Sequence, residues 1–281
     1  MRKATVLLSA LLDLVFHPAC AEEPMPTPTT KSQGDEIQLG GRNGPISFAR
    51  SGKYWGAAWL SKTGAQERIH WFDKCRQAIF FTVFDDDLKL LLEKPIRVKK
   101  QEKCAPVKIS IRGTPKGFAV SPSDVGAEFD LQSGRFVPGS RFPETGSQED
   151  SRPKEHGEGF ILREGEQTSL FAAHENTITR QRCSDDGEPL GEPEPLVVET
   201  IPEGDKTPGS EYSHHIYNLN AGVIGSQAVL LFTVGNGKLT LYSCKTGEKR
   251  SLGEAYFPTM LCDGTRCIAS MSGQKIRFVQ P

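Results

Sequence analysis

The sequence lacks the short motifs by which many enzymes are recognised. It contains no HExxH pattern, no GxSxG nucleophile motif and no phosphate-binding P-loop. The segment HENTI, which begins at His174, has no second histidine, and GNGK at 235–238 has the composition of a hairpin turn before a strand. No residue is therefore identified as catalytic from the sequence alone.

An excess of charge of one sign is also missing. The chain has 34 basic and 35 acidic residues, and no basic patch dominates. The short run RVKK at 97–100 is followed by Glu102, which favours a solvated strand end. We therefore expect no nucleic-acid partner. A pair of glycosidase carboxylates cannot be selected among 35 acids without distances.

Cysteine pairs with the CxxC spacing of zinc sites are absent, so we expect no metal and no other cofactor. Of seven cysteines, Cys20 is lost from the pairing pool by either of the processing routes described below. In an oxidising compartment the remaining six predict up to three disulfides. The segment CDGTRC contains an Asp-Gly turn signal and predicts a cross-strand bond from Cys262 to Cys267. The other four are Cys75, Cys104, Cys183 and Cys244.

Long hydrophobic runs are confined to the N-terminus. Residues 1–21 have the layout of a bacterial secretory signal, with Arg2 and Lys3 before an apolar stretch and Ala-Cys-Ala at 19–21. Two outcomes stay open: cleavage after Ala21, or lipidation of Cys20 as a lipoprotein. Residues 22–34 are rich in Pro, Thr and Glu and predict a disordered tether. Residues 35–281 remain as a single domain.

Helical patterns are scarce as well. Apolar runs of five to nine residues are separated by turn residues among 28 glycines and 19 prolines, which is typical of strands. The segment DLKLLLEK at 87–94 is the only one that predicts a helix, with the Asp run at 85–87 suited to its N-terminus. The sequence thus predicts an all-β fold.

A strand–turn–strand unit recurs along the chain. Three examples are GAEFDLQSGRFV from Gly126, TITRQRCSDDGEPLG from Thr177 and KLTLYSCKTGEKRSLG from Lys238, and a more apolar strand precedes each. Their turn glycines, at 134, 187 and 247, lie 53 and 60 residues apart. Similar units begin at Lys53 and, incomplete, at Thr265. Such a period, with up to four strands per unit, is typical of propeller blades.

These units resemble the divergent β-propellers of exported bacterial (lipo)proteins, and CDGTRCIAS and TITRQRCSDDGEPLG carry the resemblance. It is architectural only, because the WD dipeptide, the kelch Gly-Gly pattern and a complete Asp-box are absent. It implies about five four-stranded blades, with the ring closed by the N-terminal strand DEIQLG at 35–40. The rival fold is a pair of β-sandwiches.

Aromatic and histidine side chains give the only candidate binding residues. The long irregular segments are 143–159 and 197–215, and the second ends in Tyr212, His214 and His215. Side chains of these types offer contact area and hydrogen bonds to a partner. We therefore expect a binding surface on the face that carries residues 205–215. Adjacent histidines on a strand point to opposite faces, so the pair is a poor metal clamp.

Two classes of function stay open. The first is a non-catalytic cell-envelope or secreted protein that binds a protein partner or a surface polymer, in an inhibitor, immunity, assembly or adhesion role. The second is an exported hydrolase or lyase that acts on glycans through a site in the propeller funnel. Both imply an exported protein, periplasmic, anchored to the outer membrane or secreted. We expect a monomer whose membrane contact is limited to a lipid on Cys20.

Overall fold

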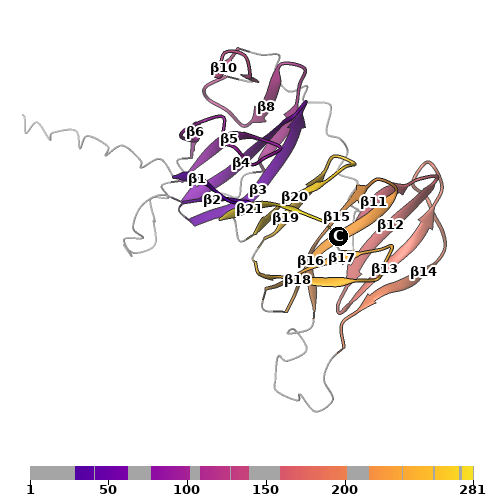
Figure 1. Ribbon diagram of the computed structural model, residues 1–281. Helices are drawn as coiled ribbons and strands as arrows, with labels where there is room; N and C mark the ends of the chain where they lie inside the picture. Colours follow the sequence, from indigo (N-terminus) through magenta and orange to yellow (C-terminus); the bar gives the residue numbers. More distant parts are fainter. Residues whose placement is uncertain are drawn as a thin grey trace, which may run out of the picture.

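All regular structure in the described part of the chain is β-strand. The computed structural model describes residues 29–40, 42–62, 77–101, 108–126, 128–138, 159–200, 215–235, 237–255, 257–271 and 274–280. The strands form five antiparallel sheets, which we call blades 1 to 5 in chain order (Figure 1). None of the described segments is a helix long and apolar enough to cross a membrane.

Four blades contain four strands each. Blade 1 consists of β3 (Arg42–Ser51), β4 (Tyr54–Lys62), β5 (Gln77–Asp85) and β6 (Ile96–Gln101), and blade 2 of β7 (Ser110–Gly113), β8 (Gly117–Ser121), β9 (Glu128–Asp130) and β10 (Arg135–Val137). Blade 3 consists of β11 (Gly159–Glu164), β12 (Gln167–His174), β13 (Thr177–Cys183) and β14 (Pro189–Val198), and blade 4 of β15 (Ile216–Ile224), β16 (Gln227–Val234), β17 (Lys238–Ser243) and β18 (Lys249–Glu254).

The fifth blade joins the two halves of the chain. It consists of β19 (Thr259–Cys262), β20 (Cys267–Met271), β21 (Lys275–Val279), β2 (Glu36–Leu39) and β1 (Thr30–Gln33), paired in that order. Ile37 of β2 lies opposite Ile276 of β21. The predicted closing strand within 35–40 is therefore confirmed.

The outermost strand β1 is a correction to the predicted boundaries. Residues 30–33 lie within the segment 22–34, for which the sequence predicted a disordered tether. They pair with all of β2, from Thr30 opposite Leu39 to Gln33 opposite Glu36. The physical reason is a tight hairpin, in which Gly34 adopts a φ of 58° that glycine tolerates without steric cost. Residues 1–28, which hold the predicted signal, lie outside the described residues.

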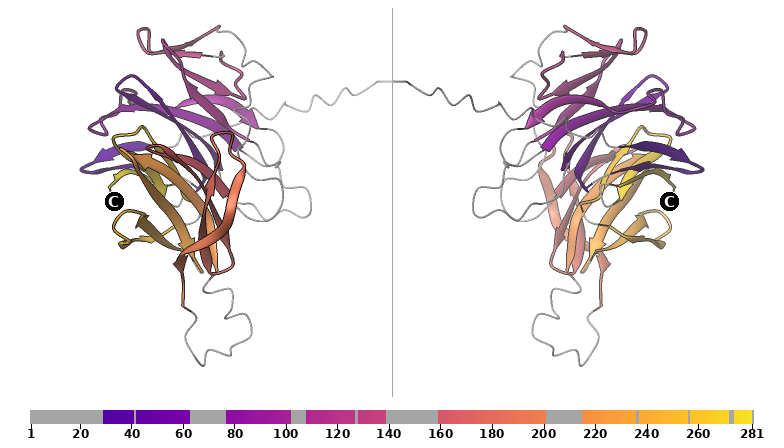
Figure 2. Two further views of the ribbon diagram at one scale, coloured as in Figure 1. Left: turned by 90° about the vertical axis from the view of Figure 1, so that its right-hand side faces the viewer. Right: turned by 90° about the vertical axis from the view of Figure 1, so that its left-hand side faces the viewer.

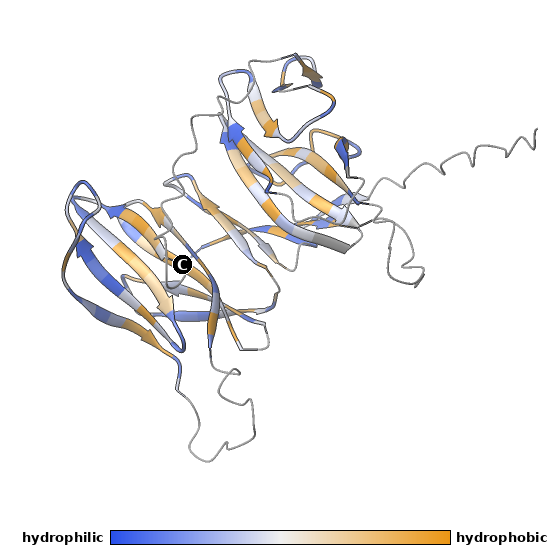
Figure 3. Cartoon of the chain, turned by 180° about the vertical axis from the view of Figure 1, so that it is seen from behind, coloured by the Kyte–Doolittle hydropathy of each residue, from blue (hydrophilic) through white to orange (hydrophobic). Residues whose placement is uncertain are grey.

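Neighbouring blades pack through their first strands, as in a propeller. Contacts join β7 to β3, β3 to β19, β19 to β15 and β15 to β11. The second strand of blade 4 is buried from Ala228 to Val234, because blades 3 and 5 cover its two faces. Figure 3 shows apolar residues recurring along the strands of the blades. The predicted five-bladed propeller is confirmed, and the sandwich alternative is wrong.

Four hydrophobic clusters hold the blades together. They lie between blades 1 and 2, 1 and 5, 4 and 5, and 3 and 4. Among the residues that the structure describes, no core cluster joins blade 2 to blade 3. Figures 1 and 2 place these two blades at opposite ends of an arc that runs 2–1–5–4–3. Blades 2 and 3 are thus each packed through a core cluster on one side.

The strands of every blade turn at two opposite ends, which form the two faces of the propeller. At the hairpin end, the first strand of each blade turns into the second and, in blades 1 to 4, the third turns into the fourth. At the link end, the second strand turns into the third and one blade connects to the next. The recurring turn glycines Gly134, Gly187 and Gly247 all lie at the hairpin end, with φ of 66°, 85° and 71°. Their recurrence reflects a turn that needs a positive φ.

The predicted helix at 87–94 is wrong. That segment is a turn followed by bends and one isolated bridge, from Leu90 to Phe84. The carboxylate of Asp85 accepts hydrogen bonds from the backbone N–H groups of Asp87 and Lys89, at 3.0 and 2.9 Å. Such local bonds satisfy the backbone in a turn, so the Asp run competes with a helix here instead of capping one.

The predicted disulfide between Cys262 and Cys267 is confirmed, and the two cysteines lie directly opposite each other in the β19–β20 hairpin. Cys183 and Cys244 are free. The prediction of up to three disulfides therefore falls to two at most, because neither Cys183 nor Cys244 is bonded. Cys75 and Cys104 lie outside the described residues.

Candidate functional site

A pocket of about 350 Å³ opens at the link end of blade 4. Its volume falls within the range of small-molecule pockets, roughly 300–1,000 Å³. The start of β15, the turn between β16 and β17, and the connection from β18 to β19 enclose it. Its described lining residues, none of which carries a charge, are Tyr217, Asn218, Thr233, Gly235, Gly237, Ala255 and Phe257.

Two aromatic side chains at the pocket are exposed. Tyr217 is 40% exposed and Phe257 is 59% exposed, which makes Phe257 the most exposed large hydrophobic residue of the described chain. Phe257 follows the end of β18 and precedes Pro258, so it lies outside any strand. Large apolar groups left in water beside a cavity are typical of a binding surface.

The backbone around Tyr217 is irregular where it meets the pocket. The pairing of β15 with β16 shifts register between Tyr217 and Asn220, and Asn218 has a φ of 50°. The side chain of Asn218 donates to Thr233 Oγ1 at 3.2 Å, and Thr233 Oγ1 donates to the carbonyl of Tyr217 at 3.0 Å. These bonds fix the bulge that presents Tyr217 at the pocket.

Phe257 also has a left-handed backbone, with a φ of 53°. A bulky residue rarely adopts this conformation, which costs about 1–3 kcal/mol and is found mainly where the surrounding structure imposes it. One such restraint is close by. The side chain of Asn220 donates to the carbonyl of Pro258 at 3.0 Å.

The predicted binding residues are described only in part. Tyr212 and His214 lie outside the described residues, so their role stays a prediction. His215 directly precedes β15, and its carbonyl accepts the backbone N–H of Gly235 at 2.9 Å. Its ring lies 6.0 Å from the ring of Tyr217, centroid to centroid. His215, the last residue of the predicted segment, therefore lies beside a lining residue of the pocket.

Sequence reasoning missed Tyr217 and Phe257. One signal was available for Phe257, because the aromatic pair at 256–257 stands next to Pro258 in a connection, where no core position is expected. Tyr217 gave no comparable signal. Nothing in IYNLN reveals that a bulge begins at Tyr217 and leaves its side chain in solvent.

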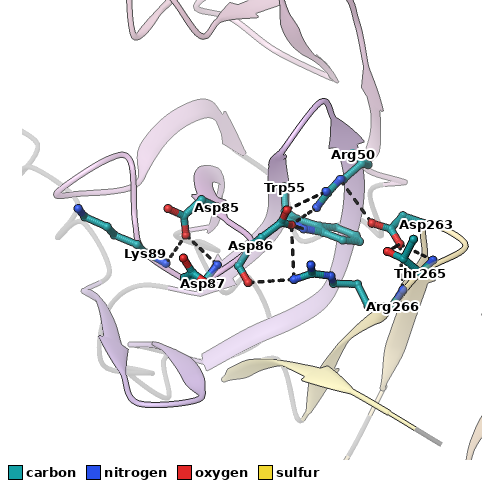
Figure 4. A network of polar contacts seen from close by, with 9 residues as sticks. All are labelled: Arg50, Trp55, Asp85, Asp86, Asp87, Lys89, Asp263, Thr265 and Arg266. Atoms are coloured by element: carbon teal, nitrogen blue, oxygen red, sulfur yellow. Dashed lines mark hydrogen bonds and ion pairs between the residues drawn. The ribbon is translucent and has the colours of Figure 1, made fainter.

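A network of charged side chains lies at the hairpin end, between blades 1 and 5 (Figure 4). The guanidinium of Arg50 binds both carboxylate oxygens of Asp86, and its Nε lies 3.5 Å from Asp263. Trp55 Nε1 donates to Asp86 at 2.9 Å, and Arg266 donates to the carbonyl of Asp86 at 3.1 Å. Each charge in this network has a partner of opposite sign.

The network holds its two carboxyls ionised. Hydrogen bonds from Arg50 are the largest cause of a lowered pKa at Asp86, and Trp55 adds to them. At Asp263 burial acts to raise the pKa, but hydrogen bonds from Thr265 and Arg266 outweigh it and the net shift is downward. These groups therefore suit an interblade ion cluster better than proton donation to a substrate.

The other described groups with shifted pKa values do not line the pocket. Glu36 and Asp130 also have lowered pKa values, caused first by hydrogen bonds from Gln38 and Ser133 respectively. Burial raises the pKa of the Cys244 thiol to about 12, so this thiol is not nucleophilic near neutral pH. No group of three or more potential metal ligands occurs in the described ranges.

No family model matches the chain, and no curated protein matches it. Among solved structures, an α-L-arabinofuranosidase from Podospora anserina is similar, with a TM-score of 0.38 and 10% identity over 92% of this chain and 98% of that chain. A glycosyl hydrolase from Bacteroides ovatus has a TM-score of 0.35 and 10% identity over 91% and 90% of the two chains. A sialidase from Trypanosoma rangeli has a TM-score of 0.31 and 10% identity over 90% of this chain and 54% of that chain. At these TM-scores the fold assignment rests on the five sheets themselves.

Proposed function

We propose that this chain is a non-catalytic, glycan-binding propeller whose site is the link-end pocket. The observation that carries the proposal is the pair of exposed aromatic residues, Tyr217 and Phe257, at a pocket lined otherwise by small and uncharged residues. The sequence left open whether the bound partner is a protein or a surface polymer. These residues favour the polymer.

A sugar ring matches this pocket chemically. The C–H groups on one face of a pyranose carry partial positive charge and pack against the negative face of an aromatic ring. The hydroxyls at the rim of the sugar need hydrogen-bond partners, which the hydroxyl of Tyr217 and the amide of Asn218 supply.

The alternative is an exported hydrolase or lyase that acts on glycans. The names of the similar structures agree with it, but their TM-scores give it no weight. Cleavage by paired carboxyls needs one with a raised pKa beside one that stays ionised. The four described carboxyls with shifted pKa values are all shifted downward, and none lines the pocket. These observations favour binding.

We also propose that the protein acts outside the cytoplasm. The disulfide between Cys262 and Cys267 supports this location, because such bonds persist in oxidising compartments. The signal-like residues 1–21 agree with export, and mass spectrometry of the mature protein would distinguish cleavage after Ala21 from a lipid on Cys20.

Retention on insoluble polysaccharides tests the proposed function. The purified mature chain is mixed with cell-wall glycans of several classes, and the bound fraction is measured. The Tyr217→Ala, Phe257→Ala double variant should lose retention, whereas Leu190→Ala, which removes a side chain that is 53% exposed on β14, should keep it.

Three outcomes would count against this function. Equal retention of the double variant and the wild type would move the site elsewhere. Release of reducing sugar from any bound glycan would favour the enzyme. Failure to bind any glycan, together with specific capture of one envelope protein that the double variant no longer captures, would favour a protein partner.

A further inference from the structure

Asn220 connects the two segments that carry the exposed aromatic residues. Its side-chain Nδ2 donates to the carbonyl of Asn218 at 2.9 Å and to the carbonyl of Pro258 at 3.0 Å. The first acceptor follows Tyr217 in the chain, and the second follows Phe257. One amide group therefore ties the β15 bulge to the connection between β18 and β19.

Both tied segments contain a residue with a left-handed backbone conformation. Asn218 and Phe257 have φ of 50° and 53°, and they are two of only four non-glycine residues with positive φ in the described chain. Asparagine tolerates this region, but a phenylalanine before proline does not, because the proline also restricts its backbone. The bond from Asn220 is a restraint that opposes relaxation of Phe257.

We propose that Asn220 is a positioning residue that presents Phe257 beside Tyr217, and that the site so formed takes one uncharged sugar unit. This inference rests on the proposed function and adds the class of ligand and the residue that sets the geometry. Asn220 itself does not line the pocket. It acts on the ligand through the two segments that it joins.

The class of ligand is inferred from the lack of charge among the lining residues that the structure describes. A carboxylated or sulfated sugar would lose hydration on entering and would find no basic side chain among the seven lining residues. A neutral sugar loses less, and its apolar face covers the exposed rings. Binding should therefore change little with ionic strength, because screening acts on charge pairs.

Fluorine NMR tests the positioning role without any ligand. The protein is labelled with 4-fluorophenylalanine, and the signal of Phe257 is identified by its disappearance in Phe257→Leu. In Asn220→Asp, where a carboxylate would face two carbonyl oxygens, this signal should shift and broaden. Asn220→Ala only removes the donor and should produce the same change in the Phe257 signal. It replaces Asn220→Asp if that variant folds poorly.

Asn176→Asp is the matched control. Asn176 makes the same kind of bond in blade 3, where its Nδ2 donates to the carbonyl of Glu199 at 2.8 Å. This substitution should lower the melting temperature to a similar extent and leave the Phe257 signal in place. An unchanged Phe257 signal in both Asn220 variants would overturn the positioning role.

Titration with a soluble neutral oligosaccharide tests the ligand. Asn220→Ala should weaken binding by about tenfold or more, equal to about 1.4 kcal/mol, while Asn176→Asp keeps the wild-type affinity. An affinity that falls steeply as salt rises, or preference for a uronic-acid oligosaccharide, would overturn the uncharged ligand. If the Phe257 signal moves in the Asn220 variants but the wild type binds no glycan, the proposed function fails and the positioning role stands.

Discussion

A Cβ atom placed on Gly222 would lie 2.9 Å from the Cβ of Cys262. Gly222 is in β15 of blade 4, and Cys262 ends β19 of blade 5, so the disulfide is packed against the neighbouring blade. The close approach is a matter of space, because Gly222 does not have a positive φ. A single methyl group added at Gly222 would therefore push blades 4 and 5 apart.

Gly222→Ala should therefore destabilise the protein by about 1–3 kcal/mol, the usual cost of overpacking a well-filled interface. Urea unfolding followed by circular dichroism measures the change. Gly44→Ala is the control, since its added Cβ would meet only ordinary contacts at 3.7 Å or beyond. Equal stability of Gly222→Ala and wild type would show that the blades separate freely here.

Removing the disulfide should cost about 2 kcal/mol or less, because the loop that it closes is very short. The sequence separation of Cys262 and Cys267 is only five. The Cys262→Ser, Cys267→Ser variant should unfold at a lower urea concentration, and reduction of the wild type should have the same effect. Peptide mapping without reductant that finds both as free thiols would contradict the bond.

The ion network between blades 1 and 5 should make stability depend on acid. The pKa of Asp86 is lower in the folded protein than in the unfolded chain, so its contribution is present above the unfolded pKa. It is lost as pH falls through the folded pKa. Asp86→Asn should cost about 1 kcal/mol at pH 7, a modest value because the pair is partly exposed.

The same measurement in acid checks the sign. As the pH falls and Asp86 of the folded wild type takes up a proton, the difference between wild type and Asp86→Asn should shrink. Glu192→Gln on the exposed strand β14 should track the wild type at both pH values. A difference that grows in acid would mean that the folded pKa of Asp86 is raised.

Thr82→Val should stabilise the protein by about 1 kcal/mol. Thr82 in β5 is fully buried, and its hydroxyl has no hydrogen-bond partner within the described part of the chain. Valine has nearly the same shape and removes the cost of an unpaired buried hydroxyl. Ser169→Ala provides the contrast, because the buried Ser169 hydroxyl accepts bonds from Gln167 and Arg180 and its loss should destabilise.

Ile37→Asp should destabilise the whole domain if the N-terminal strand completes blade 5. Ile37 is fully buried in β2 and belongs to the core between blades 1 and 5. An unpaired buried carboxylate costs several kcal/mol. Thermal unfolding measures the loss, and Gln38→Asp, a half-buried position on the same strand, is the control. Equal melting of Ile37→Asp and wild type would argue against closure by β2.

The number of blades and the closing strand could be predicted from the sequence because their signals are local. A glycine turn such as the one at Gly187 has a positive φ wherever it occurs, and β2 was the only strand-like segment near the N-terminus. The innermost strands β11 and β15 were not identified. In β11 only Gly159 is buried, and the burial of β15 is irregular, because it depends on neighbouring blades.

The pocket could not be predicted, because its geometry depends on contacts that are distant in the sequence. Asn220 reaches the carbonyl of Pro258 across 38 residues. The histidines at 214–215 were predicted as binding residues from their side-chain chemistry. Phe257 is a candidate because of its backbone conformation and its exposure. Side-chain chemistry is visible in a sequence, but a strained φ at a bulky residue is not.

In the arc order 2–1–5–4–3, the ends of the described chain lie at the centre of the arc and the middle of the chain forms its two ends. The first and last strands of the described chain meet in blade 5, at the centre of the arc. The faces on which the described residues form no core cluster belong to blades 2 and 3, which are consecutive in the middle of the chain. Fraying should therefore begin in the interior of the sequence. A circular permutant that opens the chain between these two blades and joins the native termini would place new ends where the molecule already comes to an end.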